Sequence, residues 1–262
     1  MKKQIFPEKC RGILDVTKPP YSLDNTGRED CTEKLRQLLN DLLQRQIDGV
    51  RKMYQKLEAH DGDVVFGFEN RKINGQIMVI FPEATEPAPT IYFPNGTYLV
   101  SDTVSYTLPN LQNHFIGQRP IGFELNRHIR IMGESREGTI IRLKDHCKGF
   151  EFGQSRSVIS FMQGERSNVA MSNYIENLTI DTGIGNPGAV GLVFYANNNG
   201  AVRCVTIRSG DPSGCGSIGL GVLHEIVSGC YVRDVLVDGF DYGIKVTPTR
   251  NFTVFEDITV KN

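Results

Sequence analysis

Three stretches in the second half of the chain align without gaps: Ile175-Glu-Asn-Leu-Thr-Ile180, Val202-Arg-Cys-Val-Thr-Ile207 and Val232-Arg-Asp-Val-Leu-Val237. A fourth copy ends in Asp257-Ile-Thr-Val260. The spacing from one copy to the next is 27, 30 and 23 residues, taken at Leu178, Val205, Val235 and Ile258. A second short element recurs between them, beginning at Gly191, Gly219 and Gly243. Two elements that recur in step indicate a stack of similar coils.

The variable period indicates which kind of stack is present. Leucine-rich and ankyrin-type repeats contain helices, and this part of the chain lacks a helical period. Short strands joined by loops of unequal length favour a parallel β-helix, in which each strand pairs with its equivalent about 4.8 Å away. The fold class predicted here is therefore all-β: a right-handed, single-stranded parallel β-helix with an N-terminal capping helix and hairpin.

The aligned columns predict side-chain positions, because successive residues of a strand face opposite sides. Two apolar columns are expected to face inward: Leu178, Val205, Val235, Ile258 and Ile180, Ile207, Val237, Val260. The residues between them, Thr179, Thr206, Leu236 and Thr259, are expected to face outward. A mostly polar column at the preceding bend contains Asn177, Cys204, Asp234 and Asp257. A last column, Asp181, Arg208, Asp238 and Lys261, alternates in charge and predicts a stacked ladder of ion pairs.

Residues 1–89 are predicted to form an N-terminal arm, a capping helix and a hairpin, and residues 90–262 the coils. Leucines recur at helical spacing over residues 31–58, and Asp30 with Glu33 has the spacing of a capping box. Asp48-Gly49 is a predicted interruption of this helix. Strand-like runs at 64–68 and 77–81 flank Asn74-Gly75, which predicts a hairpin.

Charge and composition exclude several classes of function. The chain has 262 residues, 29 Lys and Arg against 30 Asp and Glu, and a net charge of -1. No basic excess is present to neutralise nucleic-acid phosphates or to bind an anionic membrane surface. No apolar run approaches the roughly 18 residues of a membrane span. We therefore expect neither nucleic acid nor a membrane as partner.

The cysteines and the N-terminus bear on the compartment. The six cysteines contain no Cys-x-x-Cys pair, which argues against zinc, and we expect free, partly buried thiols. Two lysines follow Met1 without an apolar segment, so the sequence shows no intact signal peptide. The protein is expected to be secreted or periplasmic if a signal has been removed, and cytoplasmic otherwise.

Several stretches resemble the pectate-lyase superfamily: Leu23-Asp-Asn-Thr-Gly-Arg-Glu-Asp30, Ile91-Tyr-Phe-Pro-Asn-Gly-Thr-Tyr98, Ile129-Arg-Ile-Met-Gly133 and Thr139-Ile-Ile-Arg-Leu143. Gly239-Phe-Asp-Tyr-Gly243 and Phe255-Glu-Asp-Ile-Thr259 are similar to bacterial relatives of family 55 glycoside hydrolases. The resemblance covers about residues 13–35, 90–146 and 173–262. It implies a helix-capped right-handed β-helix and a carbohydrate ligand. It supplies no catalytic position, because the general acid of family 55 enzymes lies later in the chain.

Four residues are weak catalytic candidates, each with a structural alternative. Asp211 lies in Ser209-Gly-Asp-Pro-Ser-Gly-Cys-Gly216, where a carboxylate could bind sugar hydroxyls, but the same residues favour a turn. His224 and Glu225 could exchange protons with a ligand, although neighbours in a strand face opposite ways. Asp241, with Asp238, could form the acid pair of a glycoside hydrolase, although Asp238 already has a structural role in the charged column.

Arg233 and Arg250 are predicted to bind an acidic sugar, and neither a metal nor a cofactor is expected. A calcium-dependent lyase would need acidic residues on neighbouring coils. Asp181, Asp211 and Asp238 could supply them, but Arg208 interrupts the column. The glycine-rich stretches lack the Gly-Lys-Ser/Thr ending of a phosphate loop.

Three functional hypotheses remain open from the sequence. The first is the N-terminal part of a glycoside hydrolase acting on a polysaccharide such as β-1,3-glucan. The second is a non-catalytic carbohydrate-binding, tail-spike or adhesin β-helix, and the third a pectate-type lyase. A monomer is expected for an enzyme and a trimer for a tail spike. Because the repeat is still in phase at Val260, we also expect further coils beyond Asn262. The chain alone is then expected to be marginally stable or self-associating, with little or no glycosidase activity.

Overall fold

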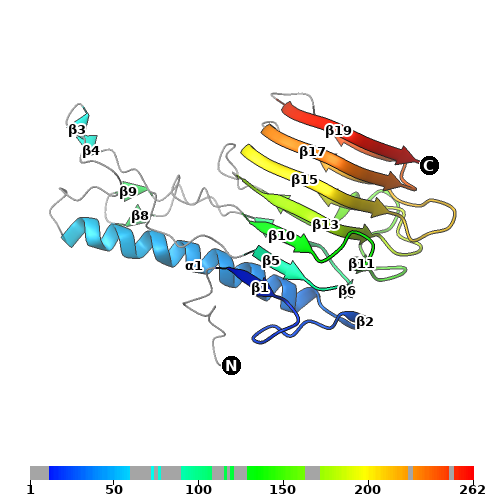
Figure 1. Cartoon of the computed structure of the whole chain (residues 1–262), viewed down its shortest axis with the longest axis horizontal. Coiled ribbons are helices and arrows are strands. Elements are labelled where there is room, and N and C mark those ends of the chain that lie inside the picture. Colours follow the sequence, from blue (N-terminus) through cyan, green and yellow to red (C-terminus); the bar gives the residue numbers. More distant parts are fainter. Residues whose placement is uncertain are drawn as a thin grey trace.

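The computed structural model describes residues 12–59, 72–73, 76–77, 90–107, 115–116, 119–120, 129–162, 172–223, 227–247 and 251–262. Its central feature is a stack of parallel strands that form two sheets. In each sheet the strands follow one another along the axis of the stack (Figure 1). The predicted all-β parallel β-helix is therefore confirmed. Within the described residues, no helix is long and apolar enough to cross a membrane.

The larger sheet contains ten described strands. They are β1 (Ile13–Asp15), β2 (Thr26–Asp30), β5 (Thr90–Phe93), β6 (Gly96–Val100), β10 (Arg130–Gly133), β11 (Thr139–Leu143), β13 (Tyr174–Asp181), β15 (Asn197–Arg208), β17 (Val227–Asp238) and β19 (Asn251–Lys261). The second sheet contains β7 (Val104–Thr107), β12 (Arg156–Met162), β14 (Ala189–Val193), β16 (Ile218–Val222) and β18 (Tyr242–Val246). Both sheets pair in parallel from coil to coil.

The pairing register reproduces the columns that the repeats predicted. Leu178 pairs with Val205, Val205 with Val235, and Val235 with Ile258. The Ile180 column follows the same order and ends at Val260. The first three members of each column are buried. Each such side chain stabilises the stack by about 1.5–3 kcal/mol relative to an exposed one.

The glycines recur in the second sheet because side chains of the larger sheet approach their Cα atoms closely across the interior of the stack. A Cβ atom on Gly191 would lie 2.2 Å from the Cγ2 of Ile207, and one on Gly219 would lie 2.1 Å from the Cγ1 of Val237. Gly243 has the same relation to Val260, at 2.3 Å. The second repeated element therefore needs glycine because the large apolar residues of the first sheet occupy that space.

The bend column contains residues in the left-handed backbone region. The φ angles of Asn177, Cys204, Asp234 and Asp257 are 54°, 53°, 51° and 52°. Each lies inside one long strand and turns its direction. In the preceding coil the same place is taken by residues 134–138, which separate β10 from β11. β13 pairs with β10 through Ile175 and with β11 through Ile180, on either side of this bend.

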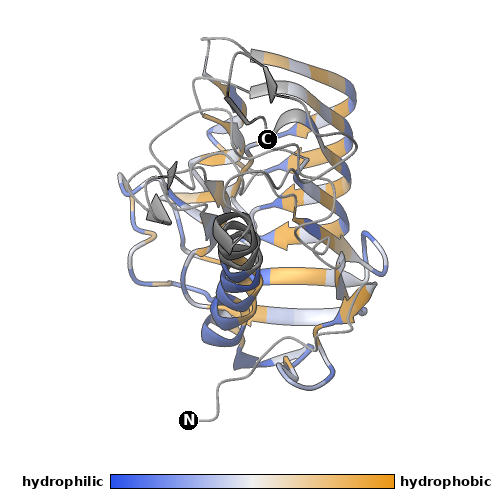
Figure 2. Cartoon of the chain, turned by 90° about the vertical axis from the view of Figure 1, so that its left-hand side faces the viewer, coloured by the Kyte–Doolittle hydropathy of each residue, from blue (hydrophilic) through white to orange (hydrophobic). Residues whose placement is uncertain are grey.

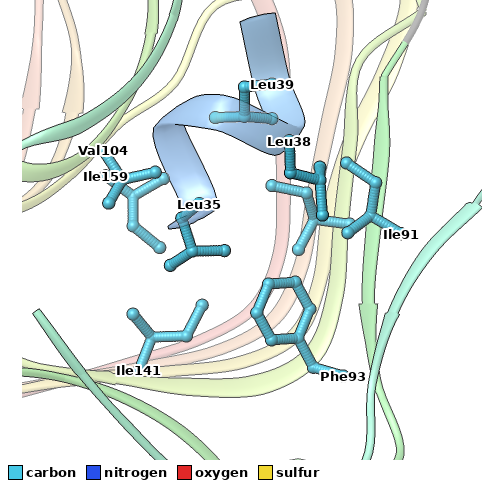
Figure 3. A pocket seen from close by; sticks show the side chains of 9 residues that line it. Leu35, Leu38, Leu39, Ile91, Phe93, Val104, Ile141 and Ile159 are labelled. Carbon is cyan, nitrogen blue, oxygen red and sulfur yellow. The ribbon is translucent and has the colours of Figure 1, made fainter. Parts of the chain in front are cut away.

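Helix α1 (Thr32–Ala59) crosses the N-terminal end of the stack and is seen end-on in Figure 2. Its buried leucines, Leu35, Leu38, Leu39 and Leu42, belong to the same apolar core as the strands. Figure 3 shows Leu35 and Leu38 facing Ile91 and Phe93 across a dry apolar cavity of about 20 Å³. The predicted capping helix is confirmed.

Two details of the helix differ from the prediction. α1 continues through Asp48-Gly49 without interruption, because one glycine inside a helix costs only about 1 kcal/mol relative to alanine. The structure does not show the predicted capping box. The Oδ1 of Asp30 accepts the N–H of Thr32 at 2.8 Å rather than that of Glu33, and the Glu33 side chain pairs with Arg36 at 2.7 Å. The first helical hydrogen bond runs from the Leu35 N–H to the Cys31 carbonyl, so the helix begins one residue later than the predicted box requires.

The predicted hairpin is an antiparallel pair on either side of residues 74–75. β3 (Lys72–Ile73) and β4 (Gln76–Ile77) are each two residues long, and Ile73 pairs with Gln76. The expected strand at 64–68 and most of the one at 77–81 lie outside the described residues. A second antiparallel pair, β8 (Phe115–Ile116) and β9 (Arg119–Pro120), was not predicted.

The last described coil exposes positions that earlier coils bury. Val260 is 49% exposed, whereas its register partner Val237 is 0% exposed. Phe255 and Val246 are also exposed, although their partners in the preceding coil, Val232 and Val222, are buried. The difference arises because each buried position is covered by the coil that follows it.

Candidate functional site

A solvent-open groove of about 620 Å³ lies on the outer face of the larger sheet, across β13, β15, β17 and β19. These four strands stack side by side in Figure 1. The groove, called the coil groove below, is lined by Glu176, Asn177, Arg203, Cys204, Arg233, Asp234 and Asp257. Its side chains come from two adjacent columns, the bend column and the column before it, which pairs Glu176 with Arg203, Arg203 with Arg233, and Arg233 with Glu256.

Glu176 is the buried acid of the coil groove. Arg130 donates from Nε and Nη2 to its Oε2, at 2.7 and 2.6 Å. Arg203 donates to its Oε1 from Nε at 2.6 Å and also from Nη2. Both carboxylate oxygens are thus bound by guanidinium groups. Glu176 orients the two arginines and has no oxygen left for proton transfer to a ligand.

Arg233 is the most accessible cation of the coil groove, with a side chain that is 52% exposed. Its Nε lies 3.8 Å from Glu256 and 3.7 Å from Asp257. These distances are ion-pair contacts but are too long for hydrogen bonds. The guanidinium can therefore exchange them for shorter bonds to an anionic ligand. Arg233, predicted to bind substrate, thus lines the coil groove, and its role stays a prediction.

One carboxylate oxygen of Asp234 accepts a hydrogen bond from a residue on another coil. Arg136 donates from Nη1 to the Oδ1 of Asp234 at 2.7 Å. This bond, with one from Cys204, holds the pKa of the Asp234 carboxyl below its usual range, against the opposing effect of partial burial. Asp234 is therefore suited to accept hydrogen bonds as an anion and poorly suited to act as a general acid.

Of the two interpretations of Asp211, sugar binding or turn formation, the structure shows the turn. Its Oδ1 accepts the Ser213 N–H at 3.1 Å and the Ser213 hydroxyl at 2.6 Å, and its Oδ2 accepts the Gly185 N–H at 3.2 Å. These bonds lower the pKa of Asp211, the Ser213 hydroxyl contributing most. Its oxygens are occupied in shaping the turn, and it does not line the coil groove.

The other candidates are not brought together. Asp241 is exposed and lines a separate hollow of about 570 Å³ with Gly239, Tyr242 and Asn262. Asp238 lies in the ladder column, in register with Arg208 and Lys261, and does not line that hollow. His224, Glu225 and Arg250 lie outside the described residues.

The charged ladder has the predicted register. Arg208 donates from Nε to the Oδ2 of the buried Asp181 at 2.8 Å. The ladder also extends back one coil to Arg142, which pairs with Asp181 in register and lies 3.8 Å from it. The Asp181 side chain is buried and the Arg208 side chain is about half exposed, so Arg208 supplies the counter-charge that a buried carboxylate needs.

Metal ligands and thiols add little to the site. In the part of the chain that the structure describes, no group of three or more His, Cys, Asp or Glu side chains could hold a metal ion. The five described cysteines are free thiols. Burial raises the pKa of the Cys204 thiol, and the bond to Asp234 raises it further, so the thiol in the coil groove is protonated near neutral pH.

The fold and the coil groove define a parallel β-helix protein that presents a row of charged side chains from successive coils along one open surface. The chain belongs to the family described as rhamnogalacturonase A/epimerase, pectate lyase-like, whose model matches residues 19–262. The predicted superfamily is thereby confirmed, and with it membership of a carbohydrate-related family.

A solved structure, ORF18 of Geobacillus virus E2, is 16% identical in sequence to this chain, with a TM-score of 0.48. The match covers 93% of this chain and 35% of the viral one, so this chain spans about a third of the length of that protein. No curated protein matches the sequence.

Proposed function

We propose that this chain binds a polysaccharide in the coil groove. The observation that carries the proposal is the open row of Arg203, Arg233, Asp234 and Asp257 on successive coils of a carbohydrate-related fold. Strands of a sheet are about 4.8 Å apart, so such a row offers a polar contact at regular intervals to a polymer lying across the coils. Carboxylates accept from sugar hydroxyls, and guanidinium groups donate to hydroxyl or carboxylate oxygens.

An acidic polysaccharide of the rhamnogalacturonan type fits the groove better than β-1,3-glucan. Arg233 holds no short ion pair and offers a planar donor set to a uronate carboxylate. The family name refers to an enzyme of rhamnogalacturonan. The described lining residues of the coil groove include no aromatic ring, so a neutral glucan would find no platform on which to pack.

Glycoside hydrolysis is the second candidate, supported by the adjacency of Asp234 and Asp257. They occupy the same bend position on neighbouring coils, which places their backbones about 4.8 Å apart. Most glycoside hydrolases use a pair of Asp or Glu carboxyl groups that flank the scissile bond. Asp234, bound by Arg136, would be the ionised member of the pair, and Asp257 the second carboxyl group. A relationship to family 55 hydrolases would place further catalytic groups elsewhere in a longer protein.

The proposal is tested by isothermal titration of the folded chain with oligomers of rhamnogalacturonan, polygalacturonate and laminarin. We expect binding to the acidic oligomers and a loss of about tenfold or more in Arg233→Ala, because a hydrogen bond to a charged group contributes about 1.5–3 kcal/mol. Arg208→Gln, outside the groove, is the control. Binding of laminarin alone, or binding unchanged in Arg233→Ala, would contradict the proposal.

The same oligomers distinguish hydrolysis from lyase chemistry. Release of reducing ends that stops in both Asp234→Asn and Asp257→Asn would support the carboxylate pair. Unsaturated products that require added calcium would favour a lyase instead. Binding without turnover would leave a carbohydrate-binding β-helix.

A further inference from the structure

A loop of residues 134–138 joins β10 to β11 and projects from the stack. In the later coils, the same position is occupied by a single residue with a left-handed backbone conformation. It is anchored at both ends: the Glu134 N–H donates to the Phe93 carbonyl at 2.9 Å, and the Thr139 N–H to that of Ser135 at 3.0 Å. In its middle, the hydroxyl of Thr179 donates to the Arg136 carbonyl at 2.7 Å. The backbone of Arg136 is thereby held against β13, one coil along the stack.

The Arg136 side chain continues over the next two coils. Its Nε donates to the hydroxyl of Thr206 at 2.8 Å and its Nη2 to the Val205 carbonyl at 3.3 Å, both on β15. Its Nη1 reaches Asp234 on β17 at 2.7 Å. One side chain thus uses all three nitrogens on acceptors 69 to 98 residues away in the sequence. Arg136 is only 21% exposed at its side chain, so its conformation is determined by these contacts.

We propose that Arg136 is a positioning residue of the coil groove: by binding the Oδ1 of Asp234, it orients this carboxylate to accept a hydrogen bond from a sugar hydroxyl. The inference rests on the proposed polysaccharide groove. Arg136 itself does not line the groove, whereas Asp234 does. It therefore acts on the ligand through Asp234.

The charges around Asp234 explain why this contact controls the carboxylate. Cys204 on β15 donates to it, and Arg233 precedes it on β17. Asp257 on β19 occupies the equivalent position in the next coil. Arg233 also lies close to two other carboxylates, 3.8 Å from Glu256 and 3.7 Å from Asp257. Arg136 pairs with Asp234 at 2.7 Å and is the largest cause of its lowered pKa.

The first test needs no ligand. The carboxyl carbon of Asp234 is titrated by NMR in protein labelled at the aspartate side chain, and its signal is assigned with Asp234→Asn. We expect a pKa below the usual range in the wild type and a higher one in Arg136→Gln. Arg208→Gln, which removes an arginine from the same outer face, should leave the Asp234 titration unchanged. An identical Asp234 pKa in the wild type and Arg136→Gln would overturn the proposal.

The second test measures binding of the acidic oligomer over a range of pH. Because the ionised Asp234 carboxylate is a stronger acceptor than the protonated one, the loss of binding at low pH should begin at a higher pH in Arg136→Gln than in the wild type. At neutral pH we expect about a tenfold loss in Arg136→Gln and in Asp234→Asn, and no further loss in the double variant. Additive losses would show that Arg136 does not act through Asp234, and would overturn the inference.

Two further measurements separate the possible failures. Thermal unfolding identifies any variant that fails to fold, and Arg136→Lys, which keeps the charge but cannot span three acceptors, then replaces Arg136→Gln. If the wild type binds no oligomer, the proposed function fails. The NMR titration still decides whether Arg136 controls Asp234.

Discussion

Leu38 provides the sharpest test of how the helix stabilises the stack. Its side chain is 0% exposed and faces the first coils across the apolar cavity (Figure 3). Leu38→Ala removes three carbon atoms, worth about 0.8 kcal/mol each on transfer from water, or about 2.4 kcal/mol. The new space joins the existing cavity of about 20 Å³, so the site starts from imperfect packing and the cavity adds its own cost. We expect a total destabilisation of about 3–4 kcal/mol.

The assay is urea unfolding followed by far-UV circular dichroism, with thermal unfolding beside it. A loss of this size should lower the melting temperature by on the order of 10 °C. Asn40→Ala is the matched control, because Asn40 lies on the same helix with an exposed side chain. Leu38→Asp should be worse still, since it places a charge in the apolar core. If Leu38→Ala and Asn40→Ala both unfold at the wild-type urea concentration, α1 does not stabilise the coils as argued.

Three further predictions follow from other parts of the structure. Val104→Ile adds one methyl group beside the apolar cavity and should raise the free energy of unfolding by up to about 0.8 kcal/mol; a lower unfolding midpoint would mean that the site is already full. The carboxylate of Asp24 accepts the Glu29 N–H and the Thr26 hydroxyl, which lowers its pKa from 3.8 to about 2. Because the folded pKa is the lower one, the stabilisation is complete above about pH 4 and is lost as the pH falls towards 2. The stability difference between wild type and Asp24→Ala should shrink over that range, and a constant difference would refute the argument. Phe255 is exposed although its register partner Val232 is buried, so we expect this chain to self-associate and Phe255→Lys to do so less. Light scattering after size exclusion measures the two apparent masses, and equal masses would contradict this.

The coil groove could be anticipated only in part from the sequence. The bend column, including Asp234 and Asp257, follows from aligning the repeats, and so does the column of Glu176, Arg203 and Arg233. Within this second column the sequence predicted only Arg233 as a binding residue; Glu176 and Arg203 were not identified, because charges on a strand surface are usually solvated. Asp211 was placed in a turn as one of its two alternatives, and its oxygens are occupied there. His224 and Glu225 stay untested.

The sequence by itself determined the stack. Inward and outward positions follow from the two-residue period of a strand, and the register follows from apolar residues that recur coil after coil; both signals are local and repeated, so no distant contact is needed to interpret them. The capping helix is visible for the same reason, through its leucine spacing.

Only the tertiary structure decided which charges face one another. Arg136 meets Asp234 across 98 residues, and Arg130 and Arg203 meet at Glu176 from coils on either side of it. Arg136 lies in an irregular loop without a period, so nothing in the sequence indicates how far along the stack its side chain extends. Stacking converts a separation along the chain into a few ångströms in space. The orientation of the Asp234 carboxylate depends on that geometry.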